Sequence, residues 1–372
     1  MSSTRPARPT LKLGTRRSAL ATAQSGMVAR RIEEVAAAAG TPVRVELVEI
    51  TTTGDVSEAS LASFGGVGVF VSRLREALHS GEIDLAVHSL KDLPSAPAPG
   101  LLLAAVPPRE DPRDVLVARD GLTVAQLPSG ARIGTGSPRR AAQLRALGLG
   151  LDVVDVRGNV DTRLRFVHEG RLDAVVLARA GLARLGRAAE ATELLDPLVM
   201  LPAPGQGALA VECRDGAADE PLAALLARLD DAPTRAAITA EQALMTALGA
   251  GCAAPLGALA EVVEGEDGDE LFMRAVITSP DGALTVRRSM TGPVEAAERI
   301  GKELAAQLEE SGAADLVPRR PPPDGSAFPD QRDQRDQRDQ RDQRDQRDLR
   351  EPAARPVARI DDSVATPREG DT

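Results

Sequence analysis

The sequence has no tryptophan and no tyrosine, and only five phenylalanines among its 372 residues. Proteins that bind single-stranded nucleic acids stack the bases on aromatic side chains, so this scarcity argues against such a function. The formal net charge of −10 also disfavours broad attraction to phosphate backbones. Any anion site must therefore be a local cluster of basic residues, in a protein whose core is built from leucine, valine, isoleucine and alanine.

Cysteine and histidine are also scarce. The cysteines, Cys213 and Cys252, fit no disulfide framework, so reduced thiols in a cytosolic protein are expected, with a single disulfide as the alternative. The histidines, His79, His88 and His168, show no ligand spacing with the cysteines, and we predict no metal site. The N-terminus lacks the apolar segment of a signal peptide, and no apolar run is long enough to span a membrane. We expect a soluble, cytoplasmic protein.

Strand-like apolar runs alternate with helical patterns from residue 11 to about residue 200. This alternation is typical of α/β domains with parallel strands. A proline-rich stretch at about 94–112 separates two such series, which indicates two domains with a ligand cleft at the carboxyl ends of their strands. The segment LPAPGQGALAVECR (201–214) reads as a loop and a strand that cross between them.

The remainder of the chain differs in composition from these two series. Residues from about 222 read as a smaller α+β unit. The DQR repeats over 330–347 have almost nothing apolar to bury, so a disordered tail is expected. The alternative is a helix stabilised by Asp–Arg pairs three and four residues apart. The predicted boundaries are 8–107 together with 201–220 for the first α/β domain, 108–200 for the second, 221–318 for the third domain and 319–372 for the tail.

Arginine recurs where predicted strands meet predicted helices, in LGTRRSAL (13–20), IGTGSPRRAAQL (133–144) and DVRGNVDTRLRF (155–166). Cations do not complement a helix N-terminus, so arginine at these places makes sense if the site holds a carboxylate or phosphate through paired hydrogen bonds. One such arginine is more often a solvated surface residue. Three loops that share the pattern predict a common anion site, although the spacing of a Walker phosphate loop is missing.

Small polar residues precede the same helices and predict where each helix begins. Ser18 and Ser137 are candidate N-cap residues, because a serine oxygen accepts a hydrogen bond from a free backbone N–H of the first turn. Pro138 suits the first helical position of the second of these helices. Either Asn159 or Asp161 caps the third helix.

The segment AVHSLKDLPS (86–95) adds a different chemistry. An apolar strand delivers Lys91 and Asp92 immediately before Pro94 ends it. One interpretation is a surface ion pair at the end of a strand. The other is a carboxylate in an arginine-rich cleft, where Asp92 stays ionised and stabilises a developing cation or moves protons. Residue spacing alone leaves the two interpretations level.

Cys252 lies among small residues in LGAGCAAPLG (248–257). No basic residue adjoins it to lower the pKa of its thiol, so the local sequence indicates a small buried or idle cysteine. The neighbouring glycines and alanines leave room around the side chain and allow the loop unusual backbone conformations.

The motifs taken together resemble the porphobilinogen deaminase family, also called hydroxymethylbilane synthases. The resemblance runs from about residue 11 to residue 318, and several of its motifs are long and specific. The matching segments are GTRRSALA, TTTGD, FVSRLREAL, AVHSLKDLP, EDPRDVLV, IGTGSPRRAAQL, VRGNVDTRL, LDAVVLARAGLARLG, LPAPGQGALAVECR and GAGCAAPLGA.

This resemblance implies a transferase of haem and corrin (tetrapyrrole) biosynthesis. Members of the family join four porphobilinogen molecules head to tail, release ammonia at each addition and finally release hydroxymethylbilane by hydrolysis. A dipyrromethane cofactor, attached through a thioether to a cysteine, primes the chain. The implied fold has two periplasmic-binding-protein-like (type II) α/β domains and a smaller α+β C-terminal domain. A monomer that binds porphobilinogen, and neither nucleic acid nor membranes, is expected.

The resemblance also implies roles for individual residues. Cys252 falls at the attachment position, as an anchor and not as a nucleophile in each turnover, and Asp92 at the catalytic position. The further positions implied to contact the cofactor are Lys91, Asp92, Ser18, Thr135, Ser137, Arg139, Arg140, Arg163 and Arg184, and those implied to contact substrate are Arg16, Arg157, Asn159, Phe70 and Gln206. Each pyrrole brings an acetate and a propionate into the cleft, which gives the recurring arginines a reason.

The sequence departs from the family pattern at a few places. Many relatives carry a lysine where this chain has Val67, and the alanines after Cys252 are smaller than usual. Two other functions are alternatives to this one. A non-catalytic anion-binding module explains the arginines but gives Cys252 no purpose, and a phosphoribosyl-type transferase needs a phosphate loop and acidic ligands that the sequence does not show.

Overall fold

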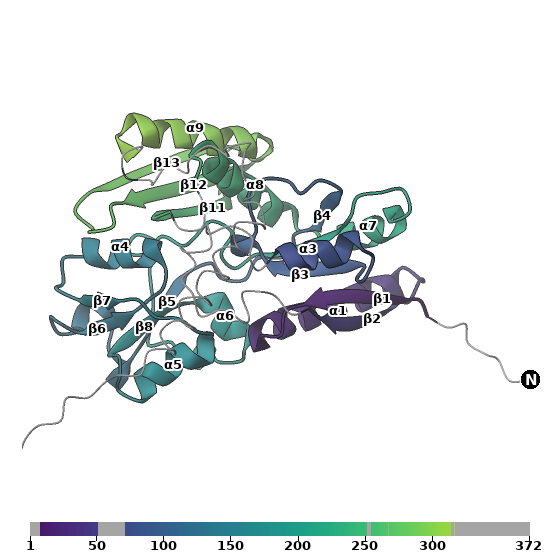
Figure 1. Ribbon diagram of the computed structural model, residues 1–372. Helices are drawn as coiled ribbons and strands as arrows, with labels where there is room; N and C mark the ends of the chain where they lie inside the picture. Colours follow the sequence, from purple (N-terminus) through teal and green to yellow (C-terminus); the bar gives the residue numbers. More distant parts are fainter. Residues whose placement is uncertain (1–7, 51–70, 251–253, 267, 314–315, 317–372) are drawn as a thin grey trace, which may run out of the picture. The chain divides into compact units, whose positions relative to one another are not determined.

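The computed structural model describes residues 8–50, 71–250, 254–266, 268–313 and 316 (Figure 1). Within these ranges the fold is mixed α/β with a smaller C-terminal part, as the sequence predicts. No helix in the described ranges is both long and apolar enough to cross a membrane. Cys252, Phe70, Val67 and the DQR repeats lie outside the described residues.

The first sheet has the strand order β2-β1-β3-β10-β4. Its elements are β1 (Thr10–Thr15), α1 (Ala19–Ala38), β2 (Arg44–Glu49), α3 (Ser72–His79), β3 (Leu85–Ser89), β4 (Leu101–Ala105), β10 (Leu209–Arg214) and α7 (Glu220–Leu226). Successive residues of β3 face opposite sides of the sheet, as expected for a strand. Leu85 packs with Ile32 of α1, whereas Ala86 packs with Leu74 of α3. Both faces of this sheet are therefore covered.

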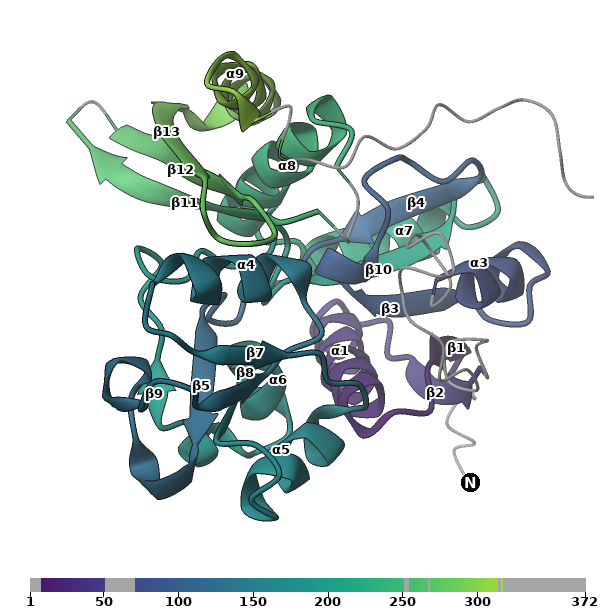
Figure 2. The same ribbon diagram turned by 60° about the vertical axis from the view of Figure 1, so that its left-hand side comes forward.

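The second sheet has the strand order β7-β6-β8-β5-β9 (Figure 2). Its elements are β5 (Asp114–Ala118), β6 (Arg132–Gly134), α4 (Pro138–Ala146), β7 (Asp152–Val154), α5 (Val160–His168), β8 (Ala174–Ala178), α6 (Arg179–Arg184) and β9 (Glu193–Leu194). The same alternation divides its core. Leu116 packs on the side of Leu144 from α4, and Val115 packs on the side of Leu164 from α5.

The prediction of parallel pairing is wrong for one interior strand in each of these sheets. The strands β1, β2 and β3 are parallel, and so are β6, β7 and β8. However, β10 runs antiparallel to β3 and β4, and β5 runs antiparallel to β8 and β9. These are the strands on which the chain enters the second sheet and returns to the first, so they follow no parallel βα crossover within their own sheet.

The third sheet is an antiparallel meander of β11 (Leu256–Gly265), β12 (Gly268–Thr278) and β13 (Thr285–Pro293). The helices α8 (Ala232–Ala247) and α9 (Ala297–Glu310) pack together against it (Figure 1). Gly301 of α9 allows this close packing, because a Cβ atom there would lie 2.2 Å from the carbonyl oxygen of Ala240. Strand β11 was not among the elements predicted from the sequence.

Candidate functional site

Three helices begin at the N-cap residues that the sequence predicts. Ser18 Oγ accepts a hydrogen bond from the backbone N–H of Ala21 at the start of α1. Ser137 Oγ accepts one from the backbone N–H of Arg140 at the start of α4, and Asn159 Oδ1 accepts one from Thr162 at the start of α5. Each cap fixes the first turn of its helix directly after a strand. The arginines of these segments are thereby placed at the ends of the parallel strands.

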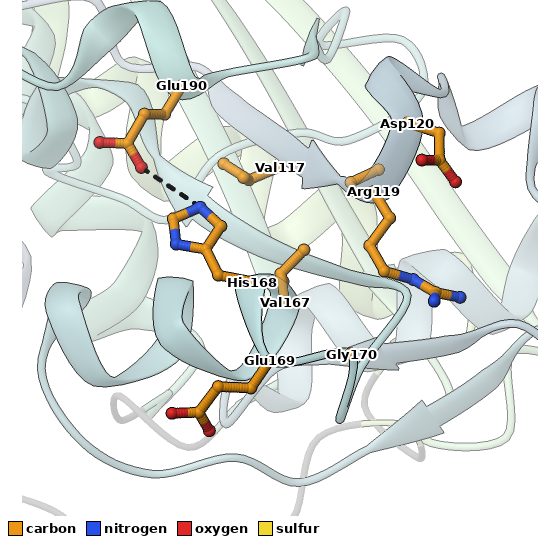
Figure 3. A pocket seen from close by; sticks show the side chains of 9 residues that line it. Val117, Arg119, Asp120, Val167, His168, Glu169, Gly170 and Glu190 are labelled. Atoms are coloured by element: carbon orange, nitrogen blue, oxygen red, sulfur yellow. Dashed lines mark ion pairs between the residues drawn. The ribbon is translucent and has the colours of Figure 1, made fainter.

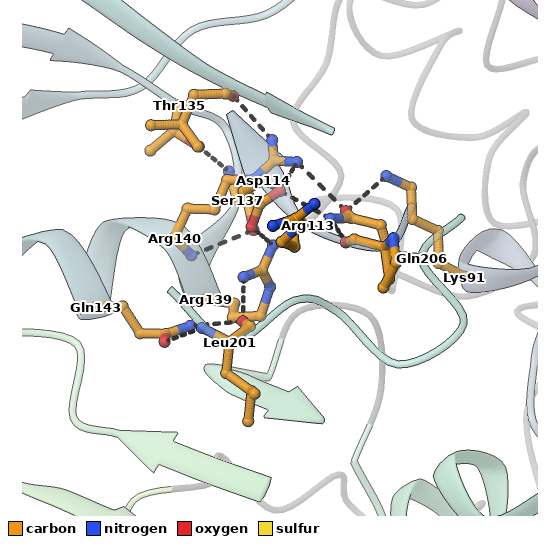
Figure 4. Close-up of polar contacts among 12 residues, drawn as sticks. Lys91, Arg113, Asp114, Thr135, Ser137, Arg139, Arg140, Gln143, Leu201 and Gln206 are labelled. Carbon is orange, nitrogen blue, oxygen red and sulfur yellow. Dashed lines mark hydrogen bonds and ion pairs between the residues drawn. The ribbon is translucent and has the colours of Figure 1, made fainter. Parts of the chain in front are cut away.

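Arg139 and Arg140, in the first turn of α4, both point to Asp114 at the start of β5 (Figure 4). Arg139 Nη2 donates to Asp114 Oδ2 at 2.7 Å. Arg140 donates to Asp114 Oδ1 through Nε at 3.1 Å and through Nη2 at 2.8 Å. The three side chains are buried, with exposed fractions of 3 %, 6 % and 0 % for the two arginines and the aspartate. A carboxylate of the chain itself thus occupies donors that the sequence assigns to a ligand.

Burial alone would raise the pKa of Asp114, but the two guanidinium groups outweigh burial and lower this pKa to about 2. Asp114 is therefore ionised at neutral pH. Asp114 is not among the residues that the sequence predicts for the site. A signal was present, because an aspartate that opens the fully buried strand DVLVA requires a buried cationic partner.

Gln206 lies between Asp114 and Lys91 and is itself buried (Figure 4). Its Nε2 donates to Asp114 Oδ1 at 2.8 Å and to the carbonyl oxygen of Pro112 at 2.7 Å. Its Oε1 accepts from Lys91 Nζ at 3.2 Å and from Arg140 Nη2 at 3.4 Å. Lys91 comes from the short 3₁₀ helix η2 (Leu90–Asp92), which follows β3 directly. One amide therefore joins the ends of β3 and β5.

A cavity, here called the cation cavity, is lined by four cationic side chains: Lys91, Arg140, Arg163 and Arg184. No carboxylate of the described residues lines it. Burial, and then the charge of Arg140, lowers the pKa of Lys91 to about 8. The same two causes lower the pKa of Arg163 to about 10, and burial lowers the pKa of Arg184. Asp114 offsets part of this charge from behind Arg140, but burial and mutual repulsion still lower these pKa values, which is an arrangement that favours bound anions.

Two of these arginines are only partly used by the protein. Arg184 Nη2 donates to the carbonyl oxygen of Gly207 at 2.6 Å, but its buried Nε has no hydrogen-bond partner among the described residues. Arg163 Nε donates to the carbonyl oxygen of Gly158 at 2.9 Å. A guanidinium group carries five N–H donors, so both side chains keep donors for a ligand carboxylate.

The remaining residues of the candidate site lie in various surroundings. Asp92 is exposed at the end of η2, and Arg16 is half-buried after β1. Arg157 forms an ion pair with Asp155 at 3.2 Å and does not line the cation cavity. Thr135 is buried, and its Oγ1 accepts a hydrogen bond from the backbone N–H of Ser137 at 3.2 Å.

A second pocket lies at the carboxyl ends of β5 and α5 (Figure 3). Both signs of charge line it: Arg119 and His168 together with Asp120, Glu169 and Glu190. His168 Nε2 lies 3.8 Å from Glu190 Oε2. Since acidic and basic side chains offset one another here, the pocket does not match a ligand rich in carboxylates, and the cation cavity does.

Comparisons of the sequence with known proteins identify its family. Residues 11–221 match the family described as porphobilinogen deaminase, dipyromethane cofactor binding domain, and residues 235–310 match its C-terminal domain. The chain is 55 % identical over 312 residues to porphobilinogen deaminase of Nocardia farcinica, covering 82 % of this chain and 88 % of that protein. It is 56 % identical over 319 residues to porphobilinogen deaminase 1 of Streptomyces coelicolor, covering 83 % and 98 %.

Among solved structures, the methionine binding protein MetQ is 13 % identical, with a TM-score of 0.39, and the match covers 59 % of this chain and 89 % of that chain. A putative periplasmic sulfonate-binding protein of Methylobacillus flagellatus is 15 % identical, with a TM-score of 0.34, and the match covers 63 % and 66 %.

Proposed function

The chain belongs to the porphobilinogen deaminase family, and on this premise we propose that it is a hydroxymethylbilane synthase. It is a transferase of tetrapyrrole biosynthesis. It condenses four porphobilinogen molecules head to tail on a dipyrromethane primer, releases ammonia at each addition and frees the product by hydrolysis. The observation that carries this proposal is the cation cavity at the ends of β3, α4, α5 and α6.

The cation cavity suits the charge of the substrate. Porphobilinogen carries an acetate and a propionate, so each addition brings two more carboxylates to the protein. The lowered pKa values of Lys91 and Arg163 mean that their charged forms are destabilised in the folded protein. A bound carboxylate reverses this effect, because an opposite charge at short range favours the charged form. Binding of carboxylates is therefore stabilising at this place.

The same residues fit the cofactor that the family carries. Lys91, Arg163 and Arg184 would hold its carboxylates, and the buried Arg184 Nε is a donor still in need of an acceptor. When bound, the dipyrromethane supplies the terminal pyrrole carbon to which the first substrate is joined.

The properties of Cys213 support Cys252 as the attachment point. Cys213 is 0 % exposed in β10, and burial raises the pKa of its thiol to about 11. The thiol therefore stays protonated at neutral pH and is unreactive. Of the two cysteines, only Cys252 is left for the thioether. A free buried thiol at Cys213 also suits a reducing compartment, and we place the enzyme in the cytoplasm, as a monomer.

Asp92 has the chemistry required of the catalytic group. Its carboxylate is exposed, and it directly follows Lys91, which lines the cation cavity. In its acid form this group gives a proton to the departing amine. As a carboxylate it stabilises the cation that forms when the amine leaves, and it takes up the proton that the pyrrole carbon loses after the new bond has formed. The surrounding cations hold the substrate carboxylates while Asp92 acts on the ring.

The three sheets support a division of the enzyme into three domains. We propose the predicted boundaries, 108–200, for the second α/β domain, and 8–107 together with 201–229 for the first. Because α7 packs against β4 and β10, with Leu226 and Leu229 in the core of the first sheet, we begin the third domain after Leu229.

The covalent mass of the purified protein tests the proposed function. The mass should exceed that of the polypeptide by one dipyrromethane, and porphobilinogen should be consumed with release of ammonia. Cys252→Ser should abolish both results, whereas Cys213→Ser should retain them. Asp92→Asn should keep the cofactor but turn over at least about 100-fold more slowly, the usual contribution of a general acid–base group. A bare polypeptide mass together with no turnover would contradict the proposal.

A further inference from the structure

We propose that Asp114 is a positioning residue: by fixing the orientation of the Gln206 amide, it directs an acceptor to Lys91 and so prepares this ammonium to bind substrate carboxylates. The assignment rests on the proposed function, because it concerns the same site. The supporting geometry is a continuous chain of contacts from Asp114 through Gln206 to Lys91 (Figure 4).

Asp114 acts through other residues because its own hydrogen-bonding capacity is used. Its two oxygens accept four hydrogen bonds, from Arg139 Nη2, from Arg140 Nε and Nη2, and from Gln206 Nε2. A carboxylate offers about four acceptor sites. With its side chain fully buried, Asp114 has no contact left to make with substrate.

The two arginines are held in place at their other ends as well. Arg139 Nη1 donates to the carbonyl oxygen of Leu201 at 2.5 Å, and Arg140 Nη1 donates to that of Val176 at 3.0 Å. Their guanidinium groups therefore act on the cavity mainly through their charge. Lys91, with a flexible side chain and three N–H donors, is better suited to follow carboxylates in different positions.

Asp114 determines which end of the Gln206 amide faces Lys91. An ionised carboxylate is an acceptor only, and the carbonyl oxygen of Pro112 is another acceptor beside it. Both acceptors require the NH₂ group of Gln206, so the amide oxygen is left to face Lys91 and Arg140. An asparagine at position 114 can donate as well as accept. It would permit the amide to turn and to present N–H donors to the ammonium.

The charges around Lys91 determine the direction of the expected effect. Arg140 and Arg139 lower its pKa, Asp92 and Asp114 raise it, and burial lowers it most. Arg163 and Arg184 line the same cavity. Removal of the Asp114 charge therefore lowers the pKa of Lys91 further, and loss of the Gln206 acceptor acts in the same direction.

The chain itself offers a direct measurement, because Lys12, Lys91 and Lys302 are its only lysines. Competitive acetylation of the cofactor-loaded enzyme across pH, read by peptide mass spectrometry, gives a titration midpoint for Lys91 with the other two as internal references. The midpoint should fall by about one pH unit in Asp114→Asn and also fall in Gln206→Met. The KM for porphobilinogen at pH 8 should rise several-fold in both variants, with a smaller change in kcat.

Asp111→Asn is the matched control. Asp111 is a half-buried carboxylate three residues away, and it pairs with Arg113 and Arg179 outside the contact chain of Gln206. Its removal should leave the Lys91 midpoint unchanged. An unchanged midpoint in folded, loaded Asp114→Asn overturns the assignment, and if that variant does not fold, an unchanged midpoint in Gln206→Met overturns it. Failure of the proposed function looks different: the wild-type protein would then carry no covalent primer and show no turnover.

Discussion

At the scale of single residues, Lys91 differs from the other cations of the site in being able to lose its proton near neutral pH. Arginine keeps its charge under all ordinary conditions, whereas lysine shifts its pKa readily when buried. Burial and Arg140 bring the pKa of Lys91 to about 8. The positive charge of the site is therefore complete below this pH and decreases above it.

Replacement of Lys91 by arginine tests this dependence on pH. In the wild-type enzyme kcat/KM for porphobilinogen should fall as the pH rises above about 8, because the protonated form is the one that binds carboxylates. The carboxylates of the bound cofactor raise the midpoint above the pKa of about 8 that Lys91 has without them. In Lys91→Arg the charge persists, so this alkaline decrease should disappear even if the larger side chain reduces the rate. Rate profiles from about pH 6.5 to pH 9.5, below the pKa of about 10 to which Arg163 is lowered, measure this decrease in both proteins. The same alkaline decrease in both proteins would assign it to another group.

The residue scale also shows what the sequence could and could not predict. The caps Ser18 and Ser137 are predictable, since capping is local and depends on residues three positions apart. The partner of Arg139 and Arg140 is not, because Asp114 lies 25 and 26 positions away and only the sheet brings it to α4. The predicted roles of Asp92 and Cys252 stay predictions that come from family resemblance.

At the scale of elements, α1 and α9 each contain an interior glycine in a different environment. A Cβ at Gly26 of α1 would meet only the Arg30 side chain, at 3.6 Å, which is an ordinary van der Waals contact. Gly301 of α9 faces α8, where a Cβ would meet the backbone of Ala240 at 2.2 Å and the Cβ of Ala243 at 2.9 Å. Helix propensity favours alanine at both places, but packing permits it at only one.

Alanine substitutions at these two glycines should therefore have opposite effects. Gly26→Ala should raise the free energy of unfolding by up to about 1 kcal/mol, the difference in helix propensity. Gly301→Ala should lower it by about 1–3 kcal/mol, because α9 must move away from α8. Urea unfolding of the two variants beside the wild type measures both. If Gly301→Ala were as stable as the wild type, the described contact of α9 with α8 would be wrong.

Sequence patterns identified most elements but not the direction of every strand. The apolar run of β5 predicts a buried strand but not its direction, because the same pattern of apolar residues fits a parallel and an antiparallel strand. Its antiparallel pairing with β8 follows from where the chain enters the sheet, which is a property of the whole topology. The same holds for β10.

At the scale of the whole molecule, Glu241 connects the loop that carries Gln206 to the third sheet. This fully buried carboxylate of α8 accepts hydrogen bonds from Arg109 Nη1 at 2.7 Å, from the backbone N–H of Gly205 at 2.5 Å and from that of Ala260 in β11 at 2.9 Å. Arg109 Nε in turn donates to the carbonyl oxygen of Gln206 at 2.8 Å. The loop that carries Gln206 is thus tied to the helix that precedes the Cys252 segment.

Neutralisation of this buried group should weaken fold and site together. Glu241→Gln leaves the buried Arg109 charge without its partner, so the free energy of unfolding should fall by about 3–5 kcal/mol, and kcat/KM should fall because the Gln206 loop loses an anchor. Glu261→Gln, which breaks the exposed pair of β11 with Arg274, should cost less than about 1 kcal/mol and leave activity unchanged. Urea unfolding and steady-state kinetics of both variants measure these effects. If the two variants lost the same free energy of unfolding and the same kcat/KM, the Glu241–Arg109 pair would contribute no more than an exposed ion pair. Glu241 would then not couple the third sheet to the loop that carries Gln206.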